Sequence, residues 1–180
     1  ALLQGGAQAL AYAESRQYTE PLFVFAVMVV AASRPILVAV QAGVDALARV
    51  LPLPTPLVRA WLGLAGVPLL GSLITEPAAM TLAALMLAPQ VFHAGVPQRL
   101  KYFALGVLFV NVSIGGTLSA FAAPPVLMVA AAWGWDSAFM VQTFGWKAAI
   151  AVVVNATLAT VALRRHLLAQ PAPAGLADPG

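Results

Sequence analysis

The most constraining feature of the sequence is a long apolar run, residues 57–92, with one acidic side chain, Glu76, near its centre. As a single straight helix this run would extend about 54 Å, far beyond the ~30 Å hydrocarbon core of a membrane. The sequence Thr75-Glu76-Pro77 divides it into two pieces, each shorter than the ~20 residues that a span requires. This arithmetic predicts a re-entrant helical hairpin with Glu76 near its tip, and two short, tilted spans are the alternative.

The composition places this run in a membrane protein. Hydrophobic residues make up 62% of the 180 residues and charged residues only 8%, whereas a soluble domain carries about 25% charged residues. The net charge of +3 is small and its basic residues are scattered, so no nucleic-acid partner is expected. We therefore expect an all-α, multi-pass integral membrane protein whose main partner is the lipid bilayer. No serine–histidine–acid set or phosphate loop points to an enzyme.

The predicted organisation is one transmembrane transporter repeat, residues 1–168, followed by a flexible proline- and glycine-rich tail, residues 169–180. Residues 33–35, "SRP", interrupt the first apolar segment because proline removes a backbone donor and kinks a helix. This segment is therefore either one broken span or a short span with an interfacial piece. Besides the hairpin, the predicted spans cover about residues 21–47, 100–135 and 139–163.

The second of these spans has a gap in its apolar pattern. Residues 113–119, "SIGGTLS", contain two glycines and three hydroxyl groups, which weaken a helix and offer it competing hydrogen bonds. Pro124 and Pro125 then suit the first turn of a second half-helix, where missing amide donors cost little. We therefore expect a discontinuous transmembrane helix. A polar-tipped hairpin followed by such a helix is the plan of one half of an inverted-repeat transporter.

The motifs extend this expectation to a family. Residues 113–125, "SIGGTLSAFAAPP", resemble the "NIGGTATLIGDPP" signature of the ion-transporter superfamily, which includes arsenite-pump membrane subunits, divalent-anion/sodium symporters and bacterial sodium/proton antiporters. A polar-tipped hairpin precedes that signature in those families, as "SLITEPAAM" does here. Together with "NVSIGG", "FAAPPVLMVA" and "FGWKAA", these motifs are most similar to the sodium/proton antiporter branch, over roughly residues 20–168.

The chain also departs from the signature. Its leading asparagine is Ser113 here, its Gly-Asp pair is Ala122-Ala123, and the asparagine after Pro-Pro is Val126. The lost aspartate removes a charge that the arsenite-type signature supplies. The substrate chemistry of the arsenite pumps therefore cannot be carried over to this sequence.

The resemblance implies a secondary active transporter that exchanges sodium, or another monovalent cation, for protons. It also implies a bacterial inner membrane location, no resident cofactor, and transported sodium and protons as the only ligands. Transporters of this kind often dimerise, so a homodimer is left open. The alternatives are an anion transporter of the arsenite or dicarboxylate type, a non-transporting membrane scaffold and, more remotely, a channel.

The distribution of positive charge bears on orientation. If the first segment crosses once and the hairpin returns to its own side, most basic residues fall on one face, opposite Arg16, and that face is expected to be cytoplasmic. The hairpin of the N-terminal repeat enters from the cytoplasm in this superfamily. We therefore expect most of an N-terminal repeat here, with the C-terminal repeat as a missing partner. The basic residues on the shared face are Arg49, Arg59, Arg99, Lys101, Arg164 and Arg165.

The candidate ion site combines the hairpin tip with the broken helix. Burial disfavours the charged form of a carboxylate and a nearby cation favours it, so a balanced Glu76 could hold either a proton or a metal ion. Hydroxyl, amide and backbone oxygens suit a small hard cation such as sodium; alternatively they only satisfy backbone freed by the break. The predicted ion- and proton-binding residues are Thr75, Glu76, Asn111, Ser113, Gly115, Gly116, Thr117 and Ser119.

Two basic residues, Arg34 and Lys147, are candidate charge partners of Glu76. The alternative for Lys147 is that its long side chain reaches the membrane interface. A static ion pair that merely fixes the hairpin is the alternative role for Glu76. His93 and His166 lie in or beside loops without further ligands, so no metal beyond a transported cation is expected.

Overall fold

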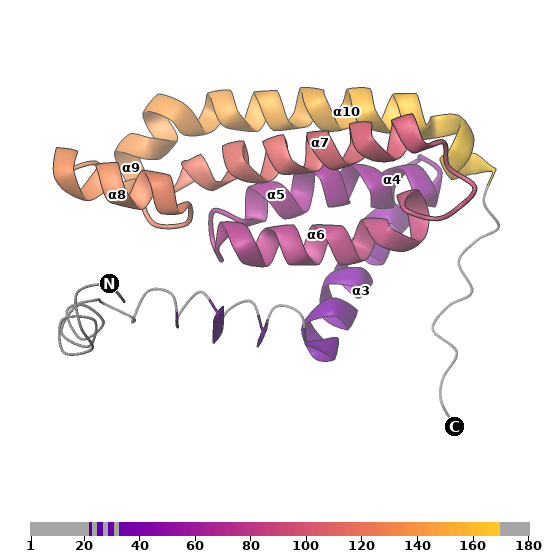
Figure 1. Ribbon diagram of the computed structural model, residues 1–180, viewed down its shortest axis with the longest axis horizontal. Helices are drawn as coiled ribbons and strands as arrows, with labels where there is room; N and C mark the ends of the chain where they lie inside the picture. The colour runs from indigo at the N-terminus through magenta and orange to yellow at the C-terminus, as the bar shows by residue number, and fades with distance from the viewer. Residues whose placement is uncertain (1–21, 23–24, 27–28, 31–32, 170–180) are drawn as a thin grey trace, which may run out of the picture.

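The computed structural model describes residues 22, 25–26, 29–30 and 33–169 (Figure 1). Within this part of the chain all regular structure is helical and no strand occurs, which confirms the predicted all-α class. Most of the first half of the predicted span 21–47 lies outside the described residues, as do Arg16 and nearly all of the predicted tail.

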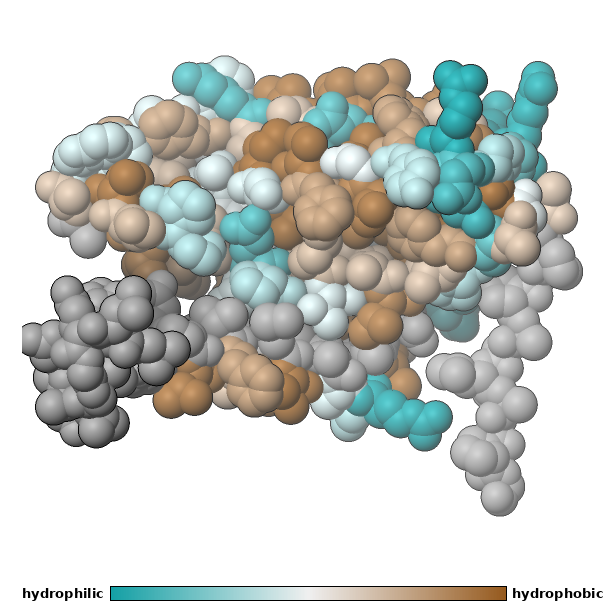
Figure 2. Space-filling model, viewed as in Figure 1, coloured by the Kyte–Doolittle hydropathy of each residue, from teal (hydrophilic) through white to brown (hydrophobic). Residues whose placement is uncertain are grey.

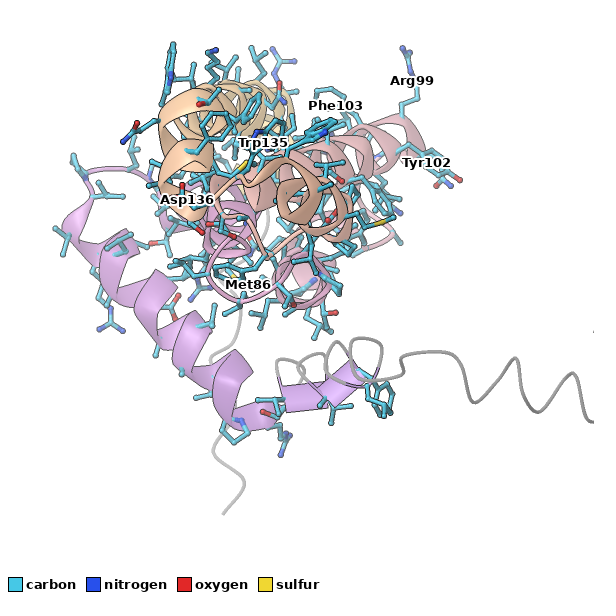
Figure 3. The ribbon with its side chains drawn as sticks, turned by 90° about the vertical axis from the view of Figure 1, so that its left-hand side faces the viewer. Met86, Arg99, Tyr102, Phe103, Trp135 and Asp136 are labelled. Carbon is cyan, nitrogen blue, oxygen red and sulfur yellow. The ribbon has the colours of Figure 1, made fainter. Side chains whose placement is uncertain are left out.

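Helix α3 (Arg34–Val50) begins where the sequence predicted an interruption. Ser33 is extended and precedes it, and Pro35 occupies its first turn, where a proline costs no hydrogen bond. The helix packs mainly on α4 and stands apart from the other helices when the molecule is viewed end-on (Figure 3). An ion pair of 2.6 Å between Asp45 and Arg59 joins α3 to α4.

A helix–turn–helix occupies the long apolar run. Its first arm is continuous in direction but passes through one π-helical stretch, and its second arm begins at Glu76. Thr75 caps that second arm, since its Oγ1 accepts a hydrogen bond from the amide of Ala78 at 3.4 Å. The elements are α4 (Thr55–Trp61), the π-helix Leu62–Gly66, α5 (Val67–Leu70), a turn at residues 71–75, and α6 (Glu76–Val91).

The chain then forms an interrupted helix followed by a long one. The first half-helix gives way to a short 3-10 turn and irregular residues 119–123, and a second half-helix ends at Gly134, whose φ of 66° favours glycine. Asp136 caps the next helix through the amide of Phe139. The elements are α7 (Gln98–Gly115), the 3-10 turn Gly116–Leu118, α8 (Pro124–Trp133), α9 (Ser137–Met140), the π-helix Val141–Gly145 and α10 (Trp146–Leu168).

Four helical segments lie side by side along the long axis of the molecule (Figure 1). The first is α4 together with α5, and the others are α6, α7 and α10. Their shared core is rich in alanine, which lets the helix backbones approach closely. The turn of the hairpin lies next to the break between α7 and α8, whereas α8 and α9 extend beyond it (Figure 1). The fully buried core positions include Ala60, Leu64, Ala78, Ala83, Leu87, Ala104, Leu108, Val152, Ala156 and Leu163.

Two described helical segments, Gln98–Leu118 and Ser137–Leu168, are long and apolar enough to cross a membrane. The start of α7 and the end of α10 lie at the same end of the molecule (Figure 1). Hydrophilic side chains gather most densely at that end, on the right of Figure 2. Arg99 and Lys101 begin α7, and Arg164 and Arg165 end α10, so we call this the basic end.

Candidate ion site at the hairpin tip

The hairpin tip contacts the broken helix through both backbone and side chain. The amide of Glu76 donates to the carbonyl of Ala122, in the irregular segment before α8, at 3.1 Å. The Ser113 hydroxyl, in the last turns of α7, donates to Glu76 Oε1 at 3.0 Å. We call this side-chain pair the tip contact. It brings together two of the predicted site residues from positions 37 apart in the chain.

Close backbone approach makes this contact geometrically feasible. A Cβ atom on Gly115 would overlap the carbonyl oxygen of Pro68, so only glycine lets α7 pass this close to α5. A Cβ on Gly116 would lie 3.0 Å from that of Ala123, which keeps the backbone folded tightly after the break. Gly115 and Gly116 therefore bring α7 and the break against the hairpin through their lack of a side chain.

A second polar cluster lies deeper in the bundle, around Asn111. Its carboxamide is completely buried; Nδ2 donates to Leu64 O at 2.7 Å and to Val152 O at 3.3 Å, and Oδ1 accepts from Asn155 Nδ2 at 3.1 Å. Leu64 lies in the π-helical stretch Leu62–Gly66, just before Pro68, which has no amide hydrogen to donate to the preceding turn. Asn111 provides a hydrogen-bond donor to this turn. We call these groups the Asn111 junction.

The remaining predicted hydroxyls bond to backbone nearby. Thr117 Oγ1 donates to Ile114 O at 2.7 Å, and Ser119 Oγ accepts from the amide of Ala122 at 3.2 Å. Thr75, as the cap of α6, is buried. In this arrangement the three hydroxyls satisfy backbone groups at the tip and the break, and their role as ion ligands stays a prediction.

Charges around Glu76 are sparse. Among the described residues the one ion pair joins Asp45 to Arg59, so neither Arg34 nor Lys147 lies within ion-pair distance of Glu76. Arg34 is exposed at the start of α3, and the Lys147 ammonium lies 5.5 Å from the Trp146 ring centroid. As the first residue of α6, Glu76 also lies where the helix dipole favours negative charge.

The arrangement offers an acidic and a hydroxyl oxygen side by side. Both are hard oxygen donors of the kind that bind small hard cations. Glu76 is half-buried and Ser113 exposed, so neither group is sealed inside the bundle. Within the described residues no three His, Cys, Asp or Glu side chains cluster as metal ligands. The tip contact is a candidate ion site because of its own two adjacent oxygens.

An apolar helical bundle in which a polar hairpin tip meets an interrupted helix has the features of a membrane-embedded carrier. A family model described as "Putative Na+/H+ antiporter" matches residues 1–177. The chain belongs to this family, and it is therefore an integral membrane transporter and not an enzyme. The comparison with curated proteins gave no match. The comparison with solved structures gave no match either.

The sequence interpretation missed the pairing of Leu64 with Asn111. A usable signal was present, since Pro68 lies inside an apolar helical run and must leave one carbonyl without its helical donor. A buried amide side chain elsewhere in the bundle is the natural partner for such a carbonyl. The two π-helical stretches, Leu62–Gly66 and Val141–Gly145, were also not anticipated, because no single residue type marks them.

Proposed function

We propose that this chain contributes half of the ion pathway of a secondary transporter that exchanges sodium for protons, with Glu76 as the group that holds either ion. The observation that carries the proposal is the tip contact: Ser113 donates to Glu76 at 3.0 Å, while no described cation lies within ion-pair distance of the carboxylate. An intramembrane carboxylate without a fixed counter-ion is suited to bind a mobile one.

Competition for one carboxylate provides the exchange. When Glu76 is ionised, it and the Ser113 hydroxyl oxygen present two hard oxygens to sodium. When a proton occupies Glu76, the negative charge that attracts sodium is gone. Since each ion displaces the other from the same group, inward movement of one is coupled to outward movement of the other.

Helix length supports a position for Glu76 inside the membrane. Helix α6 has 16 residues between Glu76 and Val91, near the basic end, and at 1.5 Å per residue it is about 24 Å long. This is less than the ~30 Å hydrocarbon core. We therefore propose that the helix–turn–helix is a re-entrant hairpin, entered from the cytoplasmic side where the basic end lies.

The rest of the pathway is proposed to come from a second repeat of opposite orientation, and this chain is proposed to be the N-terminal one. Inverted repeats place the ion site at their interface. The exposed position of Ser113, beside the half-buried Glu76, suits such an interface. Asn111, Thr117 and Ser119 then hold the broken helix in shape around the site.

The test uses inverted membrane vesicles that contain the intact transporter and hold an acidic interior. Sodium is added and the pH gradient is followed with a fluorescent dye. We expect sodium to collapse the gradient with the wild type, and Glu76→Gln to reduce this response at least about tenfold, because one unit charge near the ion is lost. Asp136→Asn is the matched control, since Asn caps α9 as well as Asp does.

Equal expression of the variants is required for the comparison. If Glu76→Gln responds to sodium like the wild type, Glu76 is structural and the proposed site is wrong. If no monovalent cation changes the gradient but oxyanions or dicarboxylates cross the membrane, the protein is an anion transporter.

A further inference from the structure

A cleft of about 440 Å³ opens beside the broken helix, on the side of the molecule where α8, α9 and α10 meet. Its walls are mostly apolar and include Val126, Met140 and Ala151. Trp135 and Phe144 form an aromatic wall, with ring centroids 5.5 Å apart. Lys147 is the single charged residue among those that line the cleft.

The charge of Lys147 has no acidic partner in the part of the chain that the structure describes. No carboxylate of the described residues lies within 4.0 Å of its ammonium, and none of the described residues that line the cleft is acidic. Its recorded contact is with the face of Trp146, at 5.5 Å. The cleft thus offers one positive group above an apolar floor, which suits a ligand with an anionic head and a hydrocarbon chain.

The position of Lys147 along α10 agrees with a lipid headgroup. Lys147 lies 17 positions before Arg164 of the basic end in the same helix, which corresponds to about 26 Å. If the arginines lie at one boundary of the ~30 Å hydrocarbon core, the backbone of Lys147 stops a few ångströms short of the other boundary, which its long side chain can reach. Tryptophans surround Lys147 in sequence and space: Trp146 precedes it, and Trp133 at the end of α8 contacts Trp135, which Figure 3 shows from this end of the molecule. Aromatic residues of this kind mark the membrane interface.

We infer that this cleft binds an anionic phospholipid, with the phosphate on Lys147 and part of an acyl chain against Val126, Met140 and Ala151. If this side of the bundle faces the bilayer, lipid chains and not water surround the cleft, so an acyl chain fills it at no cost in hydration. A lysine at the interface adds attraction for an anionic headgroup. The inference depends on membrane insertion and on this side facing lipid and not the proposed second repeat; it does not depend on the ion coupling at Glu76.

The test measures lipids retained by the intact transporter, purified in mild detergent and analysed by native mass spectrometry. The probes are phosphatidylglycerol and phosphatidylcholine with identical acyl chains. We expect the wild type to retain about fivefold more phosphatidylglycerol, the preference that one basic side chain near a headgroup provides. Lys147→Gln should abolish this preference, and Lys101→Gln, at the basic end, should leave it unchanged.

A second variant tests the apolar floor. Ala151→Phe fills the cleft and should reduce retention of both lipids, because it occupies the space of the acyl chain. Val126→Phe fills the same cleft from α8 and replaces it if Ala151→Phe does not fold. Unchanged retention in the filled variant overturns the proposal. An equal loss of the phosphatidylglycerol preference in Lys101→Gln also overturns it, because it would indicate general attraction to the charged surface. A lower melting temperature of Lys147→Gln in the absence of lipid overturns it too, because it would indicate that Lys147 pairs with a carboxylate of the protein.

Discussion

The Asn111 junction and the tip contact lie about half a helical turn apart on α7, yet their polar groups are engaged very differently. Asn111 is fully buried, and its carboxamide makes three hydrogen bonds to two other segments, the π-helix Leu62–Gly66 and α10. Glu76 and Ser113 are only partly covered, and a single hydrogen bond joins their side chains. One cluster is closed by protein groups, whereas the other retains capacity to bind.

The difference separates two uses of polarity inside an apolar bundle. A buried polar group that is fully bonded fixes the fold, because breaking any of its bonds leaves an unpaired partner. A carboxylate with spare lone pairs and access from outside can exchange one partner for another. The same helix therefore holds its shape at one point and presents a partly exposed polar contact at the next, where we propose the ion binds.

Gly115 gives the largest expected effect, because both clusters depend on the close passage of α7 over α5. A Cβ in Gly115→Ala overlaps backbone at Pro68, which cannot move aside without shifting α5. We expect a loss of about 3 kcal/mol in the free energy of unfolding. Thermal unfolding in detergent, followed by circular dichroism, measures it.

Gly106 on the same helix is the matched control. None of the described residues comes within 4 Å of a Cβ placed there, and alanine stabilises a helix more than glycine does. Gly106→Ala should therefore leave stability unchanged or slightly raised. Equal stability of the two variants would show that the close passage at Gly115 does not support the bundle.

The second prediction breaks the Asn111 junction. Asn111→Leu leaves the carbonyl of Leu64 unpaired in the core, which should cost about 2 kcal/mol of stability. The apparent affinity for sodium, measured from the dye response at equal amounts of folded protein, should change little. Asn155→Leu, which removes only one bond from a half-buried position, should cost less. If Asn111→Leu lowers the apparent affinity for sodium, Asn111 is an ion ligand. The distinction between the two clusters is then wrong.

The third and smallest prediction concerns the tip contact. Ser113→Ala removes one hydrogen bond at an exposed position, so stability should be unaffected while the apparent affinity for sodium falls about fivefold, the equivalent of ~1 kcal/mol. Ser113→Thr keeps the hydroxyl and should restore most of the affinity. A loss of melting temperature in Ser113→Ala, without any change in sodium affinity, would assign the contact to the fold.

Much of the helical plan could be predicted because proline, glycine and hydroxyl residues act locally. Thr75-Glu76-Pro77 marks the turn that α6 follows, and the glycine pair at 115–116 lies where α7 ends. The sequence predicted that the hairpin tip with Glu76 meets the broken helix. It could not predict which of several nearby hydroxyl groups would bond to the Glu76 carboxylate. That selection depends on the rotation of α7 relative to α6, which side-chain packing sets.

The pairing of the charged residues shows what the sequence could not predict. Arg34 and Lys147 were candidates because an apolar sequence offers few cations, yet Asp45 and Arg59 form the ion pair of the described residues. Hydropathy and position in the sequence predict how deep a charged residue lies in the membrane. They do not predict which side of the helical bundle it faces. Which of two charges at similar depth meet is decided by helix neighbours, here α3 and α4.

The hydrogen bond between Asn111 and Leu64 has a consequence for how the protein is made. The two residues are 47 positions apart, so the first arm of the hairpin leaves the ribosome well before its partner. Until α7 arrives, the turn before Pro68 lacks the donor that Asn111 provides, and hydrocarbon penalises an unpaired backbone group by several kcal/mol. The arm is thus expected to wait beside the insertion machinery and to enter the lipid together with α7, as one unit of membrane biogenesis.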